Sequence, residues 1–290
     1  MEVRAAASPK DAMHYTTERL REEFLIQNLF VPGETRMVYS HIDRIITGGI
    51  VPVTPISLAA REELWADYFL QRREMGIINI GAEGMITVDG KKFPLKNRDG
   101  LYIGMGSKNV TFASKDRFDP ARFYLNSTPA HHTYPTVLIR PDGRDGDEEK
   151  EGTVIVKPEN KVELGTLEES NHRTICKYIL PGQVESCQLV MGMTRLEPGS
   201  VWNSMPCHTH ERRMEVYLYF DLSADAFVMH YMGEPSQTRH IVVRNEEAVI
   251  SPSWSIHCGC GTRAYSFIWG MAGENQEFDD MDAIPNQDLL

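Results

Sequence analysis

Four side chains in the last third of the chain have the chemistry of a transition-metal site. His208 and His210 are separated by one residue, Glu215 follows closely, and His257 lies further along the chain. Three imidazoles and one carboxylate are donors that zinc and other divalent transition metals accept in proteins. The sequence therefore predicts a metal centre with one ion per chain.

The spacing of these residues predicts the elements that carry them. Strand side chains alternate between the two faces, so two histidines two residues apart would point the same way. Glu215 lies five residues beyond His210, and this odd offset requires the chain to bend between them. The polar residues 211–213 suit such a bend, and a new strand would begin near Glu215. His257 would follow a later strand and a turn.

This pattern resembles the cupin family, which combines a glycine, a His-x-His motif, a glutamate and a second motif, Pro-x-Gly-x-x-His. The matching residues are Gly199, His208, His210, Glu215, Pro252 and His257. Trp254 replaces the glycine of the second motif, and the interval between Gly199 and His208 is longer than usual. The alternative interpretation is two surface histidines and an unrelated core histidine.

Composition restricts the classes of function and the compartment. Among 290 residues, 41 are acidic and 30 are lysine or arginine, so the net charge of -11 disfavours nucleic-acid binding. No apolar run approaches the roughly 18 residues of a membrane span, and the N-terminus lacks the apolar core of a signal peptide. Five cysteines form no disulfide framework. We expect a cytoplasmic protein with no membrane partner.

The chain divides into two halves that resemble each other. An acidic stretch at 142–151 is typical of a solvated linker. The sequence predicts an N-terminal cupin-like domain without metal ligands over 1–150, ending in this linker, and a metal-binding cupin domain over 151–290. Residues 70–75 resemble 210–215, and each segment leads into an apolar strand. In the first half, Tyr68 and Leu70 stand where the two histidines would be.

The expected fold is mainly β, with two tandem double-stranded β-helix barrels and short helices near the N-terminus. An apolar stripe within residues 16–30 predicts a helix capped by Thr16 or Thr17, and a second helical piece is expected near 57–69. Short apolar runs then alternate with glycine and proline turns, and Val88-Asp89-Gly90 indicates a hairpin.

Several stretches together resemble the 5-keto-4-deoxyuronate isomerase (4-deoxy-L-threo-5-hexosulose-uronate ketol-isomerase) family over nearly the whole chain. These stretches are 37–49, 129–136, 171–178, 202–215, 250–257 and 267–275. The resemblance implies zinc (Zn2+) ligands at His208, His210, Glu215 and His257. It implies a cytoplasmic homohexamer of pectin and polyuronide degradation. The implied reaction converts 5-dehydro-4-deoxy-D-glucuronate to 3-deoxy-D-glycero-2,5-hexodiulosonate.

An aldose–ketose isomerisation also needs a group that moves a proton and a cation that binds the substrate carboxylate. His41 and Asp43 would share one face of a predicted strand, and Glu211 adjoins a metal ligand although its parity points it outward. Structural hydrogen bonding is the alternative role for the first pair. The candidates for the carboxylate, for which arginine suits better than lysine, are Arg173, Arg44 and Arg212.

Other interpretations of the same ligand set stay open at this point. Iron, manganese or nickel would also accept these donors. An iron-dependent cupin dioxygenase, a non-catalytic sugar-acid-binding cupin and a barrel held closed by a structural metal are the rival hypotheses.

Overall fold

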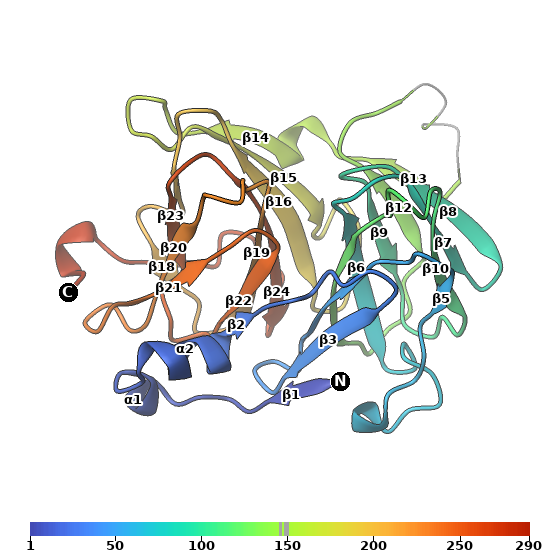
Figure 1. Ribbon diagram of the computed structural model, residues 1–290, viewed down its shortest axis with the longest axis horizontal. Helices are drawn as coiled ribbons and strands as arrows, with labels where there is room; N and C mark the ends of the chain where they lie inside the picture. The colour runs from blue at the N-terminus through green and yellow to red at the C-terminus, as the bar shows by residue number, and fades with distance from the viewer. Residues whose placement is uncertain (145–146, 148–150) are drawn as a thin grey trace. The chain divides into compact units, whose positions relative to one another are not determined.

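The computed structural model describes residues 1–144, 147 and 151–290, and its fold is mainly β, as predicted (Figure 1). Two compact units are present. We call them the N-terminal unit (Met1–Arg4, Asn28–Lys157, Tyr178–Val190) and the C-terminal unit (Ala5–Gln27, Pro158–Lys177, Met191–Leu290). The predicted domain boundary at residue 150 lies outside the described residues and stays a prediction, and part of the acidic linker lies there too.

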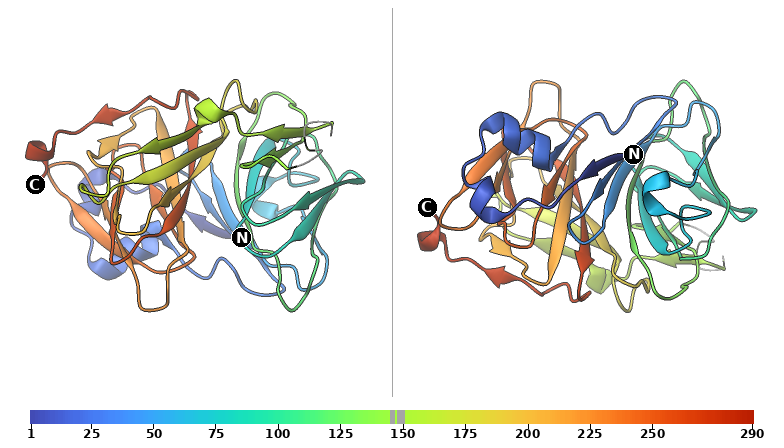
Figure 2. Two further views of the ribbon diagram at one scale, coloured as in Figure 1. Left: turned by 90° about the horizontal axis from the view of Figure 1, so that it is seen from above. Right: turned by 90° about the horizontal axis from the view of Figure 1, so that it is seen from below.

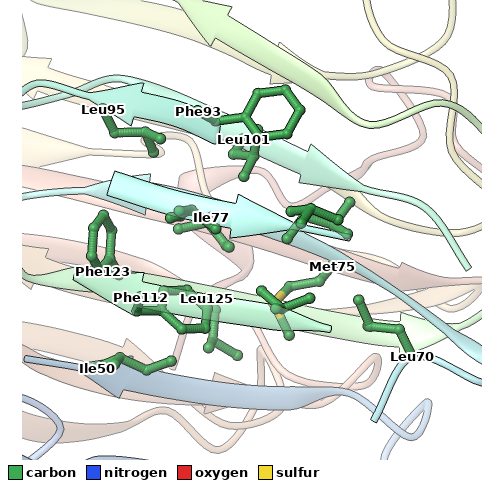
Figure 3. Close-up of a cluster of buried hydrophobic side chains, with 14 of the residues drawn as sticks. Ile50, Leu70, Met75, Ile77, Phe93, Leu95, Leu101, Phe112, Phe123 and Leu125 are labelled. Carbon is green, nitrogen blue, oxygen red and sulfur yellow. The ribbon is translucent and has the colours of Figure 1, made fainter. Parts of the chain in front are cut away.

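The N-terminal unit consists of two sheets that face each other across an apolar core. One sheet has the order β1 (Glu2–Arg4), β3 (Thr35–Ser40), β4 (Ile46–Ile50), β11 (Phe123–Pro129), β6 (Arg73–Asn79), β9 (Gly100–Ile103), β12 (Val137–Arg140), β13 (Thr153–Ile155). The other has the order β5 (Ile56–Ser57), β10 (Val110–Ser114), β7 (Gly84–Val88), β8 (Lys91–Leu95). Alternate side chains of these strands, including Ile77, Leu101 and Leu125, fill the core (Figure 3).

The C-terminal unit repeats this design and adds a small third sheet. The large sheet has the order β14 (Lys161–Leu164), β15 (Arg173–Ile179), β16 (Val190–Leu196), β24 (Ser266–Gly273), β19 (Arg213–Phe220), β22 (Glu247–Ser251), β2 (Leu25–Ile26). The second has the order β17 (Trp202–Asn203), β23 (Cys258–Gly261), β20 (Val228–Met232), β21 (Arg239–Val243). The third pairs β18 (His208–Thr209) with β25 (Asp282–Ala283).

Strand pairing identifies the residue of the N-terminal unit that corresponds to Glu215. In β19, Glu215 pairs with Ser251 of β22 and with Met271 of β24. In β6, Met75 pairs with Ile103 and Ser127 on the corresponding neighbours, β9 and β11. Met75 therefore occupies the place of Glu215, and its fully buried side chain belongs to the apolar core.

The helices differ from the expectation. Helix α2 covers Thr17–Phe24, and the Thr16 hydroxyl caps it by accepting from the Arg19 N–H. The predicted helix continued to residue 30, which is wrong, because Leu25 and Ile26 form strand β2 and pair with β22. Near 57–69 only the 3-10 turn Glu62–Leu64 forms.

The remaining helical pieces are short. They are α1 (Pro9–Ala12) and the 3-10 turns Pro158–Asn160 and Asn286–Asp288. In the C-terminal unit, α2 lies against β21 and β22 (Figure 2). The predicted hairpin is confirmed, because Asp89 and Gly90 both adopt positive φ between β7 and β8. Within the described residues, no helix has the length and apolar character needed to cross a membrane.

Candidate metal centre

The four predicted ligands converge in the C-terminal unit. One donor atom from each of His208, His210, Glu215 and His257 lies within 4.8 Å of the others. The Nε2 atoms of the three histidines are 3.1 Å from one another, and Glu215 Oε2 is 2.8 Å from His257 Nε2. His210, Glu215 and His257 are buried, and His208 is partly exposed. The cluster of four residues is therefore largely buried, with only His208 partly accessible to solvent.

Local structure brings these residues together as the spacing predicted. His208 lies on β18, Glu211 and Arg212 form a turn, and β19 begins at Arg213 and carries Glu215. β22 ends at Ser251, and a turn then leads to His257 just before β23. The predicted bend and the predicted later strand and turn are confirmed.

Hydrogen bonds fix which nitrogen of two histidines faces the centre. His210 Nδ1 lies 2.6 Å from the Asp280 carbonyl oxygen, and His257 Nδ1 lies 3.3 Å from that of Ser255. A carbonyl only accepts, so each Nδ1 carries the proton and donates it. The Nε2 lone pairs then face one another and the Glu215 carboxylate. Such a set of electron-pair donors fits a divalent cation, which would relieve their mutual repulsion.

The electrostatics of the cluster favour the unprotonated forms of His208 and Glu215. Burial, together with the neighbouring His257, lowers the pKa of His208 to about 2. Burial opposes ionisation of Glu215, yet His257 and His210 bring the pKa of this carboxyl below its ordinary value. Neutral imidazoles and an ionised carboxylate are the forms that bind a metal.

A pocket opens beside the four predicted ligands and extends across one face of the large sheet. It encloses about 720 Å³, including space open to solvent. Its wall comes from the neighbouring strands β14, β15, β16, β24 and β19, with a further part from residues 204–208 and 278–281. The main lining side chains are Leu164, Arg173, Ile175, Thr194, Ser204, Tyr217, Phe267, Trp269, Met271, Phe278 and Met281.

The structure brings only one of the predicted arginines into this pocket. Arg173 lines it from β15, and burial lowers the pKa of its guanidinium. Arg212 forms ion pairs with Asp280 and Asp282 instead. Arg44 is exposed and belongs to the N-terminal unit.

The predicted proton carriers lie outside the pocket lining. Glu211 is exposed in the turn before β19, in agreement with its outward parity. His41 and Asp43 belong to the N-terminal unit, where they lie in the turn between β3 and β4. The strand predicted for them is wrong, because Asp43 and Arg44 both adopt positive φ. Their catalytic role stays a prediction.

Sequence reasoning missed two hydroxyl groups of the pocket. Tyr217 lies two residues beyond Glu215 on β19, and its hydroxyl is 3.1 Å from that of Ser204. Burial raises the pKa of Tyr217 well above its ordinary value, so it stays a neutral hydrogen-bonding group. Strand alternation from Glu215 could have identified Tyr217. Trp269 also lines the pocket, and its indole N–H donates to the Thr194 hydroxyl.

Comparison with known proteins gives full-length matches. The profile of the KduI/IolB family matches residues 24–285. A 4-deoxy-L-threo-5-hexosulose-uronate ketol-isomerase from Lachnoclostridium phytofermentans is 66% identical over 292 residues and is covered completely, as is this chain. An enzyme of the same name from Escherichia coli is 54% identical, again with complete coverage of both chains.

Solved structures with low sequence identity share the fold. An IolB-like protein from Salmonella typhimurium superposes with a TM-score of 0.60 at 12% identity, covering 83% of this chain and 86% of that one. Tomato vicilin gives a TM-score of 0.56 at 12% identity, covering 89% and 85%. These likenesses confirm the cupin-type architecture.

Acid should destabilise the protein through His230, which is fully buried and hydrogen-bonded to the Tyr219 hydroxyl. Burial, together with His257, lowers the pKa of His230 from 6.5 to about 3. Below pH 6.5 the unfolded chain takes up a proton that the folded chain excludes, so stability falls as the pH falls. From pH 6.5 to 5 this group removes about 2 kcal/mol.

Urea unfolding of metal-free protein at pH 7 and pH 5 checks this prediction. His230→Gln should reduce the loss of stability between the two pH values, whereas His14→Gln, at an exposed histidine, should not. Equal pH dependence in the wild type and His230→Gln would contradict it.

Proposed function

We propose that this chain, which belongs to the KduI/IolB family, is a metal-dependent aldose–ketose isomerase of pectin and polyuronide degradation. It converts 5-dehydro-4-deoxy-D-glucuronate to 3-deoxy-D-glycero-2,5-hexodiulosonate. The observation that carries the proposal is the complete-length identity of 54–66% to ketol-isomerases from several bacteria. The buried cluster of three histidines and a glutamate supplies a site with fitting chemistry.

Zinc, one ion per chain, is the metal we propose for His208, His210, Glu215 and His257. A divalent ion there would polarise the substrate carbonyl and stabilise the negative charge that develops on its oxygens. The four residues leave room for substrate oxygens if coordination expands beyond four. The tautomers of His210 and His257, fixed by backbone carbonyls, support this assignment.

Arg173 is the group we propose for the substrate carboxylate. Among the described residues that line the pocket, it is the only arginine or lysine. Its strand, β15, lies three strand positions from β19, which carries Glu215. At about 4.8 Å per strand, this spacing amounts to roughly 14 Å along the sheet, part of which the arginine side chain spans. A six-carbon chain with its aldehyde at the metal would bring its carboxylate toward Arg173.

The proton leaves the hydroxyl-bearing carbon next to the aldehyde and returns to the former aldehyde carbon. His41 and Asp43 remain our candidates for this transfer, with Glu211 as the next. Tyr217, a neutral buried hydroxyl beside Glu215, would donate a hydrogen bond to a substrate oxygen. His41→Ala and Asp43→Asn that keep full turnover and full metal content would exclude the first pair.

A homohexamer in the cytoplasm is the proposed state of the enzyme. Both parts of this proposal rest on the family resemblance, and the lack of a disulfide framework agrees with the compartment. Light scattering that finds only a 33.0 kDa species at micromolar concentration would contradict the assembly.

The reaction itself can be tested with purified protein, the ketouronate substrate, and neither oxygen nor nicotinamide. NMR should show the ketose product, since the isomerisation moves hydrogen within one molecule. An absolute requirement for oxygen would instead indicate a dioxygenase. Binding of the sugar acid without turnover would indicate a sugar-acid-binding cupin.

Removal of one metal ligand should abolish both metal and activity. Wild-type protein should contain about one divalent ion per chain by elemental analysis, and His257→Ala should contain almost none. His240→Ala, at an exposed histidine of the same unit, is the control and should keep the ion. Full occupancy in a His208/His257 double variant would refute the site.

Loss of the Arg173 charge should weaken substrate binding. Arg173→Gln should raise KM about 10- to 100-fold, because a hydrogen bond to a charged group contributes about 1.5–3 kcal/mol. Arg195→Gln, at an exposed arginine of β16 paired with Glu197, should leave KM unchanged. Steady-state kinetics decide this point, and an unchanged KM in Arg173→Gln would exclude the carboxylate contact.

A further inference from the structure

The chain returns to the metal centre after its last long strand. Residues 274–284, which we call the strap, follow β24 and run along the C-terminal unit, as the red segment in Figure 2 shows. Within the strap, β25 pairs antiparallel with β18, with Ala283 opposite His208. The Ile284 N–H also donates to the Cys207 carbonyl at 3.0 Å. The short strand that bears a ligand histidine therefore has the strap as its sheet partner.

Asp280 connects the strap to a ligand directly. Its backbone carbonyl accepts the 2.6 Å hydrogen bond from His210 Nδ1. Its carboxylate accepts from Arg212 Nε at 2.8 Å and from Asn275 Nδ2 at 2.6 Å. The side chain and the backbone of Asp280 thus have different roles. The carboxylate holds the strap in place, and the backbone carbonyl contacts His210.

Arg213 holds the backbone of the strap in place through hydrogen bonds. Its side chain is almost fully buried, and it donates to the carbonyl oxygens of Phe278 and Asp280, each at 3.1 Å, and to that of Glu277. A buried guanidinium is costly unless its N–H groups are satisfied, so these carbonyls are held at defined positions. Arg213 Nε is 3.4 Å from His210 Nδ1, further than the Asp280 carbonyl is. Two donors do not bond each other, which leaves the carbonyl as the partner of Nδ1–H.

We propose that the strap is a positioning element of the metal centre, in which Asp280, held by Arg212 and Arg213, sets the tautomer and ring orientation of His210. This inference rests on the proposed metal-dependent function. The same strap contributes Phe278 and Met281 to the pocket wall, so its placement also shapes the substrate site. Partners of metal-bound histidines that accept the second N–H typically change metal affinity 10- to 100-fold when they are lost.

The test uses Asp280→Ala in the full-length protein. This change removes the carboxylate that anchors the strap but keeps the backbone carbonyl, so it loosens the contact with His210 without burying a new group. Asp225→Ala is the matched control, because it removes an exposed ion pair with Arg263 elsewhere in the same unit. Arg212→Gln removes the other partner of the same ion pair. It replaces Asp280→Ala in the test if that variant fails to fold.

Cobalt binding gives a readout that is independent of turnover. Competition with a chelator should show 10- to 100-fold weaker Co²⁺ binding in Asp280→Ala, with an altered visible absorption spectrum of the bound ion. Asp280→Asn, whose amide oxygen still accepts from Arg212, should restore part of the affinity. Asp225→Ala should bind Co²⁺ as the wild type does.

The outcomes separate this inference from the proposed function. Wild-type affinity and spectrum in both Asp280→Ala and Arg212→Gln would overturn the role of the strap while leaving the metal centre intact. A wild-type protein that binds no Co²⁺ would overturn both. If Asp225→Ala loses as much Co²⁺ affinity as Asp280→Ala, the loss reflects general destabilisation of the unit, and the inference is overturned.

Discussion

Mutual repulsion between electron-pair donors is the constraint on which the C-terminal unit depends. Three imidazole nitrogens and a carboxylate oxygen lie within 4.8 Å of one another in a largely buried place, where water screens them poorly. Such a group does not assemble by itself. It persists because strands and turns position the four residues, because backbone carbonyls hold the rings of His210 and His257, and because the remainder of the barrel is well packed around them.

The alternation of side chains along β19 shows how the barrel holds these donors close together despite their repulsion. Glu215 and Tyr217 face the pocket, whereas their chain neighbours Met214 and Val216 are buried on the opposite face. Every residue of this strand is buried, and it pairs on both sides over most of its length. A side chain on such a strand has little freedom, so the position of Glu215 is set by the strand itself. The N-terminal unit keeps the same strand pairing but places Met75 where Glu215 stands, and the Met75 side chain packs in an apolar cluster.

Sequence predicted the local part of this site well and the long-range part poorly. The spacing of His208, His210 and Glu215 required a bend, and strand alternation settled which side chains converge. The helix predicted through residue 30 ended early because Leu25 and Ile26 found a strand partner more than 200 residues away, which no local pattern records. His41 and Asp43 were placed on a strand because their alternation suited one, yet positive φ values turn the chain there.

The role of Asp280 could not be predicted for a different reason. The group that contacts His210 is a backbone carbonyl, which every residue possesses, so the amino-acid type carries no signal for it. Arg212 gave a signal, but as a cation it suggested substrate binding, and Arg213 was seen only as part of a polar bend. Only the fold shows that both donate to the strap.

The place of the strap in the chain has a consequence for biosynthesis. Asp280 follows the histidine that it contacts by 70 residues. Because a ribosome makes the chain from its N-terminus, a nascent C-terminal unit has its histidines well before it has the segment that orients one of them. The histidine cluster therefore reaches its final geometry only after residue 280 has been added, and a product truncated before the strap would lack it.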